Sequence, residues 1–98
     1  MDLNVHAIHF DADRKLVDFV NGKVTKLELF FDNIISGEVY LRLDQSNKIA
    51  NKVAEIKLLI PGKELFAKKQ CSSFEEAADL ACEALRKQVK KQKAKKLN

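Results

Sequence analysis

The residues with the clearest chemical potential are the basic side chains near the C-terminal end of the chain. Residues 1–85 hold 11 basic and 14 acidic side chains, whereas residues 86–98 hold seven basic and no acidic ones. A few lysines could serve only to match a helix dipole, but this run is too long for that purpose. The pattern predicts a near-neutral body with a basic arm that binds a polyanion. The basic residues are Arg86, Lys87, Lys90, Lys91, Lys93, Lys95 and Lys96.

A second basic pair lies earlier in the chain. Lys23 and Lys26 are three residues apart, which places them one turn apart on a predicted helix. In that arrangement the two ammonium groups could follow a phosphate backbone together. The alternative is an ordinary solvated helix face, and the spacing alone does not decide between the two.

The chain offers little for catalysis or metal binding. Cys71 would be a nucleophile only with a base beside it, and Cys82 lies next to an apolar stripe, where a small hydrophobe is expected. His6 and His9 would point to opposite faces of a predicted strand, and no third ligand accompanies them. The glycines form no phosphate-binding loop. We therefore expect no enzyme, no metal and no cofactor; a hydrogen bond from His6 to a partner stays open.

The basic arm must be positioned by a long predicted helix over residues 73–96. Ser73 can cap its start, and Glu76 completes a capping box. Residues 90–98 carry so many like charges that we expect this tail to fray in the free protein. Apolar residues recur at spacings of three and four and form one stripe. The stripe consists of Phe74, Ala77, Ala78, Ala81, Leu85 and Val89.

A first helix is predicted over residues 13–30, with Asp11 or Asp13 as its N-cap. Gly22 in its interior should cost about 1 kcal/mol relative to alanine, so this helix depends on tertiary packing. Phe19 and Phe30 should lie at the edges of its buried stripe. The stripe consists of Leu16, Val20, Val24, Leu27 and Phe31.

Strands are predicted from alternating apolar and polar residues. In the second strand Val39, Leu41 and Leu43 should face inward, and Pro61-Gly62 suits a type II turn between the last two strands. The element order is β-α-β-β-β-α. It predicts an α+β fold, a two-layer sandwich in which both helices pack on one face of a four-stranded sheet, similar to double-stranded-RNA-binding domains. The strands cover residues 2–10, 35–44, 52–60 and 64–71.

Length and composition fit one soluble domain over residues 1–98. The first ten residues have neither the basic start nor the apolar run of a signal peptide, and no segment is long enough to span a bilayer. The cysteines fit reduced thiols. We expect a cytoplasmic protein that is monomeric when free, with no membrane partner and no small-molecule substrate.

With these elements in order, the chain resembles the short ribosome hibernation-promoting factors, also known as the sigma-54 modulation or ribosome-associated inhibitor family. The resemblance covers essentially the whole chain. It lies in residues 4–10, 23–31 and 73–91, and in the proline-glycine hairpin followed by residues 68–71. In the last helix the family pattern is matched by Ala78-Asp79, Leu85, Lys87, Gln88 and Val89.

The resemblance implies a bacterial protein that binds the small ribosomal subunit and its 16S rRNA. It would occupy the channel of messenger and transfer RNA at the A and P sites, and so stop translation in stationary phase or stress. By position, the family's RNA contacts fall on Lys23, Lys26, Lys87 and Lys91. Charge alone adds Arg86 and Lys90.

The chain departs from the family at two positions where relatives can carry lysine, which here hold Ala84 and Leu29. The tail over residues 93–96 could replace the missing contacts. The chain ends at Asn98, so we expect it to lack the C-terminal dimerisation domain of longer members.

The residue pattern leaves two alternatives to ribosome binding open. A general nucleic-acid-binding module would bind naked RNA or DNA as well as ribosomes, with a steep salt dependence. An enzyme that uses Cys71 would show thiol-dependent turnover. Free duplex RNA is a poor ligand, because Glu75 and Glu76 begin the last helix, where double-stranded-RNA-binding domains place lysines.

Overall fold

The predicted order of elements is confirmed by the computed structural model, which describes residues 1–96, with side chains as far as Lys91. Strands and helices alternate as β-α-β-β-β-α, with one short 3-10 helix after the first α-helix. The elements are β1 (Asp2–Ala7), α1 (Arg14–Thr25), η1 (Lys26–Leu29), β2 (Ser36–Leu43), β3 (Lys52–Ile60), β4 (Lys63–Cys71) and α2 (Phe74–Lys96).

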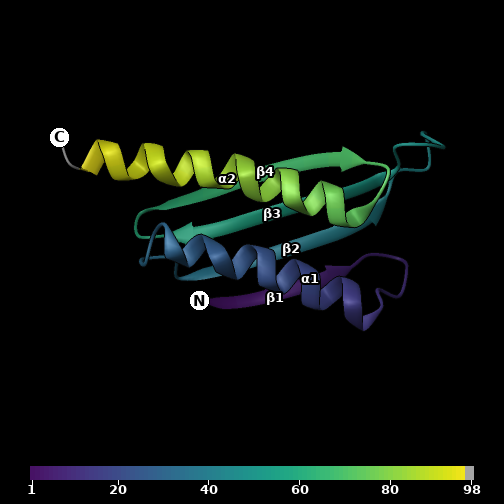
Figure 1. Ribbon diagram of the computed structural model, residues 1–98, viewed down its shortest axis with the longest axis horizontal. Helices are drawn as coiled ribbons and strands as arrows, with labels where there is room; N and C mark the ends of the chain where they lie inside the picture. The colour runs from purple at the N-terminus through teal and green to yellow at the C-terminus, as the bar shows by residue number, and fades with distance from the viewer. Residues whose placement is uncertain (97–98) are drawn as a thin grey trace.

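The strands form one mixed sheet in the order β1-β2-β3-β4. β1 runs parallel to β2, and the other neighbours are antiparallel. Because a parallel pair needs a crossover connection, α1 must pass over the sheet between β1 and β2. Figure 1 shows α1 and α2 on the same face of the sheet, which confirms the predicted two-layer α+β sandwich.

The core lies between the helices and this face of the sheet. The register places Val5, Val39, Ile56 and Ala67 opposite one another in one row across the strands. Both predicted helix stripes are buried, so the apolar periodicity identified the inner faces correctly. The buried stripe residues are Leu16, Val20, Val24, Leu27 and Phe31 in the first helical region and Phe74, Ala77, Ala78, Ala81, Leu85 and Val89 in α2.

Each of the two α-helices begins after a side chain that accepts a backbone hydrogen bond. Asp13, rather than Asp11, caps α1: its Oδ1 accepts the N–H of Leu16 at 2.8 Å. Ser73 caps α2, and its Oγ accepts the N–H of Glu76 at 3.1 Å. Each cap satisfies a donor that would otherwise lack a partner in the first turn.

The structure differs from the prediction at the end of β1, at the end of α1 and at Leu43. β1 ends at Ala7 rather than at residue 10, and His9 has a φ of 62°, so the argument that His6 and His9 point to opposite faces of one strand was wrong. The helix expected over residues 13–30 changes to 3-10 geometry at Lys26. Leu43 is 37% exposed rather than inward, because β1 ends opposite Leu41 and leaves that side of β2 uncovered.

α2 is longer than the sheet beneath it. At about 1.5 Å per residue its 23 residues span roughly 34 Å, and the molecule measures 46 Å along its longest axis. Figure 1 shows the last turns of α2 extending past the ends of the strands. The predicted fraying of residues 90–98 stays a prediction: the helical backbone continues to Lys96, and the side chains of residues 92–98 lie outside the described part. No helix among the described residues is long and apolar enough to cross a membrane.

Candidate nucleic-acid interface

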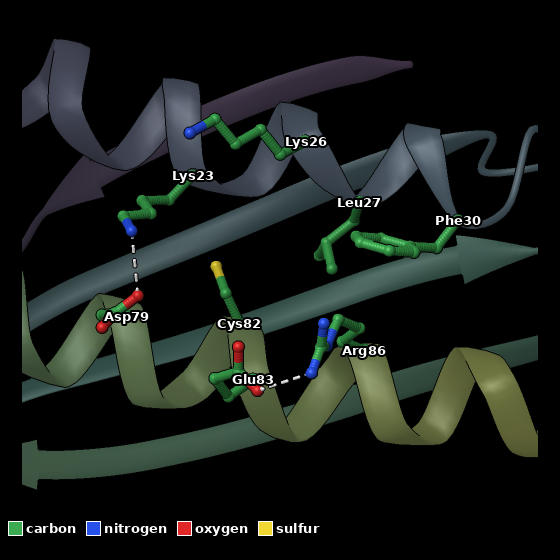
Figure 2. A pocket seen from close by; sticks show the side chains of 8 residues that line it. All are labelled: Lys23, Lys26, Leu27, Phe30, Asp79, Cys82, Glu83 and Arg86. Atoms are coloured by element: carbon green, nitrogen blue, oxygen red, sulfur yellow. Dashed lines mark ion pairs between the residues drawn. The ribbon is translucent and has the colours of Figure 1, made fainter.

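The candidate interface is built around the seam between the first helical region, which consists of α1, η1 and Phe30, and the helix α2. The two helices run in the same direction, so successive turns of one face successive turns of the other (Figure 1). Lys23 faces Asp79 at one end of the seam, and Phe30 faces Arg86 at the other (Figure 2). Residues that are far apart in the sequence therefore share one surface.

An open groove of about 150 Å³ follows this seam. Basic and acidic side chains line its rim, and apolar side chains lie between them. The eight lining residues are drawn in Figure 2: Lys23, Lys26, Leu27, Phe30, Asp79, Cys82, Glu83 and Arg86. Of the predicted RNA-binding residues, the structure thus brings together Lys23, Lys26 and Arg86.

Lys23 is held from two sides. Its Nζ lies 3.0 Å from Oδ1 of Asp79 on the neighbouring helix. The same ammonium group lies 5.6 Å from the centre of the Phe19 ring, within the range of a cation–π contact. The ammonium group of Lys23 therefore has a defined position in the free protein.

Arg86 is held in a similar way. Its Nη2 lies 3.3 Å from Oε2 of Glu83, and its Cζ lies 5.5 Å from the centre of the Phe30 ring. The Nε atom of Arg86 is buried and has no hydrogen-bond partner among the described residues. The guanidinium group pairs with Glu83 through Nη2, so its Nη1 donors make no ion pair among the described residues.

The other predicted residues carry their charge without compensation. Lys26, Lys87, Lys90 and Lys91 are exposed, and none forms an ion pair within the described part of the chain. The last three lie on α2 beyond the seam. Lys93, Lys95 and Lys96, also predicted from charge, lie outside the residues whose side chains are described. Contact of any of these residues with RNA stays a prediction.

Sequence reasoning missed the acidic and aromatic parts of this surface. Asp79 and Glu83 are four residues apart and lie beside the buried stripe of α2, so their shared face was visible in the sequence. The pairing of Asp79 with Lys23 was not visible, because it joins different helices and depends on their packing, whereas Glu83 and Arg86 are three residues apart on α2, a spacing that already brings their side chains together. Phe30 was expected only at the edge of a stripe.

The surroundings of both thiols disfavour the thiolate form. Cys82 is buried, and removal from water, assisted by the charge of Asp79, raises the pKa of its thiol to about 12. Burial also raises the pKa of the Cys71 thiol, with a further contribution from Glu76. Since the thiolate is the reactive form, this environment opposes the alternative of an enzyme that uses Cys71.

His6 belongs to the other face of the sheet. Its Nε2 lies 2.6 Å from Oε2 of Glu38, and its ring stacks on Tyr40 with centroids 5.0 Å apart. This hydrogen bond lowers the pKa of the exposed Glu38 carboxyl. Among the described residues, no three histidine, cysteine or carboxylate side chains gather as a metal site would require. The imidazole of His6 is therefore engaged within the chain.

The sequence is similar to a known protein family over almost its whole length. The model of the family described as "Sigma 54 modulation protein / S30EA ribosomal protein" matches residues 3–97. A ribosome hibernation promoting factor of Pseudomonas putida is 32% identical over 95 residues, which cover 97% of this chain and 89% of the relative. One from Azotobacter vinelandii is 30% identical over 97 residues, covering 99% and 87%. A ribosome hibernation promotion factor of Bacillus subtilis is 28% identical, and the match spans 97% of this chain and 50% of the relative.

Solved structures share the fold. A ribosomal subunit interface protein from Coxiella burnetii superposes with a TM-score of 0.85 at 18% identity, covering 96% of this chain and 99% of that one. The N-terminal domain of Protein Y from Thermus thermophilus gives a TM-score of 0.80 at 23% identity, covering 93% and 98%. At these identities the likeness supports the α+β architecture alone.

Proposed function

Since the chain belongs to the family of sigma 54 modulation proteins and S30EA ribosomal proteins, we propose that it binds the ribosome and promotes hibernation. Relatives of similar length that match almost the whole chain are ribosome hibernation promoting factors. The proposed partner is the small subunit with its 16S rRNA, and the proposed place is the channel of messenger and transfer RNA at the A and P sites. Occupation of this channel would stop translation in stationary phase or under stress.

The observation that carries the proposal is the joint basic surface of the two helices. Lys23 and Lys26 from the first helical region line the same groove as Arg86, and α2 continues with Lys87, Lys90 and Lys91. A protein that binds only one short stretch of nucleic-acid backbone would need the basic residues of only one helix. Two sets on neighbouring helices suit a curved surface that presents phosphates from several directions.

The mechanism requires binding and no chemical step. Ammonium and guanidinium groups would replace the counterions of the RNA backbone, and release of those counterions would supply much of the affinity. Structured RNA is recognised mainly by shape and backbone contacts, which suits a body with a continuous core. The bound protein would exclude messenger and transfer RNA by occupying their space. It would act in the cytoplasm and as a monomer, without catalysis.

A general RNA-binding module is the second candidate. The exposed lysines of α2 beyond the seam, Lys87, Lys90 and Lys91, favour it. None of them forms an ion pair among the described residues, so no paired carboxylate would repel an arbitrary polyanion there. The candidates differ in how well binding survives competition by bulk RNA.

Reversal of two charges on α2 tests the proposed surface. We expect Lys87→Glu with Lys91→Glu to raise the concentration that inhibits translation in a reconstituted system by more than about tenfold. The variant loses two attractions and gains two repulsions, each on the order of 1 kcal/mol at contact in water. Inhibition of translation and binding to ribosomes are measured side by side.

A control variant makes the same charge change away from the helices. Lys48→Glu with Lys57→Glu alters exposed lysines of the β2–β3 loop and of β3, where Lys57 lies over Tyr40 on the face of the sheet opposite the helices, and we expect inhibition within about threefold of the wild type. Equal loss in both variants would mean that net charge alone matters. Full inhibition by the α2 variant, with its fold intact by circular dichroism, would show that the site assignment is wrong.

A further inference from the structure

Two carboxylates lie within the basic surface, where a simple polyanion binder would have none. Asp79 pairs with Lys23, and Glu83 pairs with Arg86, at the rim of the groove between α1 and α2. We propose that Asp79 and Glu83 are positioning residues that set the selectivity of this surface for the ribosome over bulk RNA. This inference rests on the proposed function and assigns its specificity to named side chains.

The carboxylates divide the basic surface into two zones. Around the groove, three basic and two acidic side chains leave a single net positive charge. Beyond the groove, Lys87, Lys90 and Lys91 of α2 meet no carboxylate among the described ion pairs. Loosely docked RNA is therefore attracted by the outer zone and only weakly by the seam.

Stability does not explain why the carboxylates are there. The side chains of Asp79 and Glu83 are 52% and 51% exposed, and ion pairs with such exposure contribute little to folding. The packing of α2 comes from its separate apolar stripe. Their position within the surface that meets RNA is what distinguishes them.

The geometry lets each carboxylate direct its partner without using all its donors. Lysine has three N–H donors, so the ammonium of Lys23 can bind Asp79 and still donate to a phosphate. Arg86 uses Nη2 toward Glu83 and lies with its Cζ 5.5 Å from the centre of the Phe30 ring, while Nη1 forms no ion pair among the described residues and can donate to a phosphate. Both cations are thereby fixed in direction before RNA arrives, which lowers the entropy lost on binding.

Rigid and flexible RNA would respond differently to this arrangement. A folded rRNA surface that presents phosphates at the right places would gain from the fixed donors on both helices. Flexible RNA would gain nothing from their direction and would meet the repulsion of the two carboxylates. Asp79 and Glu83 thus disfavour the wrong partner more than the right one.

The test removes the two charges while keeping side-chain shape, in the variant Asp79→Asn with Glu83→Gln. Affinity for a mixed-sequence single-stranded RNA is measured by fluorescence anisotropy, and affinity for small ribosomal subunits by co-sedimentation, both at several salt concentrations. We expect RNA binding to tighten about fivefold, which corresponds to one screened charge contact. Its slope of log K against log salt should steepen by roughly 0.7 for one added phosphate contact.

Ribosome affinity should stay level or weaken, so that the ratio of ribosome to RNA affinity falls about fivefold. A ratio equal to or above that of the wild type would overturn the inference. The conservative variants Asp79→Glu and Glu83→Asp retain the charges and should restore most of the ratio. If thermal unfolding shows that the double variant does not fold, Glu83→Gln alone decides the matter, with a fall of about twofold expected and an unchanged ratio contradicting the inference.

Asp18→Asn with Glu64→Gln is the matched control, because it adds the same net charge at exposed positions outside the groove. Here both affinities should move together and leave the ratio unchanged. A wild-type protein that binds RNA but does not prefer ribosomes would contradict the proposed function itself. If the wild-type protein selects ribosomes and the variant Asp79→Asn with Glu83→Gln has the same ratio of ribosome to RNA affinity, only this inference is contradicted.

Discussion

At the scale of single residues, the environment of each basic side chain decides what it can contribute. Lys23 and Arg86 are paired with carboxylates and rest against aromatic rings. Lys87, Lys90 and Lys91 are exposed and have no described ion pair. The first two suit directional contacts, and the last three suit general attraction to phosphate. One surface can thereby combine affinity with selectivity.

The thiol of Cys82 provides a prediction at the same scale. With a pKa of about 12 against an ordinary value of 9.0, its reactive thiolate should be roughly a thousandfold rarer at pH 8 than in an unfolded chain. We therefore expect iodoacetamide to label Cys82 very slowly in the folded protein and quickly in denaturant, as followed by mass spectrometry. The native rate should keep rising with pH above 10. Equally rapid labelling in both states would contradict the buried position.

At the scale of elements, α2 does two things with different parts of its length. Its stripe from Phe74 to Val89 packs on the sheet and on α1, which fixes the helix in place. Its last turns extend past the strands (Figure 1) and carry basic residues away from the body. A helix that ended at Val89, its last core residue, would keep the groove and lose Lys90 and Lys91.

Replacement of glycine by alanine should change the stability of the protein in opposite directions at positions 22 and 62. A Cβ at position 22 of α1 would meet nothing within 4 Å, so Gly22→Ala should stabilise the protein by about 0.5–1 kcal/mol through helix propensity and reduced unfolded-state entropy. Gly62 has a φ of +76° in the β3–β4 turn, so Gly62→Ala should destabilise it by on the order of 1 kcal/mol. Urea unfolding measures both changes. A less stable Gly22→Ala would mean that α1 needs the glycine for another reason.

The spacing of apolar residues identified the helices and strands, because the period of each backbone decides which side chains face the core. Every residue of the two helix stripes is buried, and both N-caps lie among the residues proposed for them. Ends were harder, because backbone geometry can change while the side-chain pattern continues. The left-handed backbone at His9 and the 3-10 turns from Lys26 left no clear signal in residue types. The exposure of Leu43 followed from the early end of β1.

At the scale of the whole molecule, the candidate site depends on contacts that no local pattern reveals. The basic run of α2 was evident from charge alone, as was the pair Lys23 and Lys26. Glu83 and Arg86 meet within α2, whereas the pairing of Lys23 with Asp79 requires both helices to lie on the same face and to run in the same direction. That arrangement follows from the parallel pairing of β1 with β2 and from the long crossover between them.

The shape of the molecule fits the proposed role. Extents of 46 × 23 × 19 Å describe an elongated body, and the seam groove and the outer lysines of α2 lie along its helical face. A body of this kind can fill a channel lined by phosphate and contact it over a long edge. Electrostatic attraction should dominate its approach, so binding should weaken as salt increases.

The most direct measurement is co-sedimentation of the purified protein with bacterial ribosomes through a sucrose gradient, in the presence of excess bulk RNA. We predict stoichiometric migration with small subunits and intact ribosomes, unaffected by the competitor, because the surface recognises the shape of the ribosome as well as its charge. The Lys87→Glu and Lys91→Glu variant should remain at the top of the gradient. Wild-type protein that bulk RNA strips from the ribosomes would contradict the account, since the basic surface would then be a general polyanion binder.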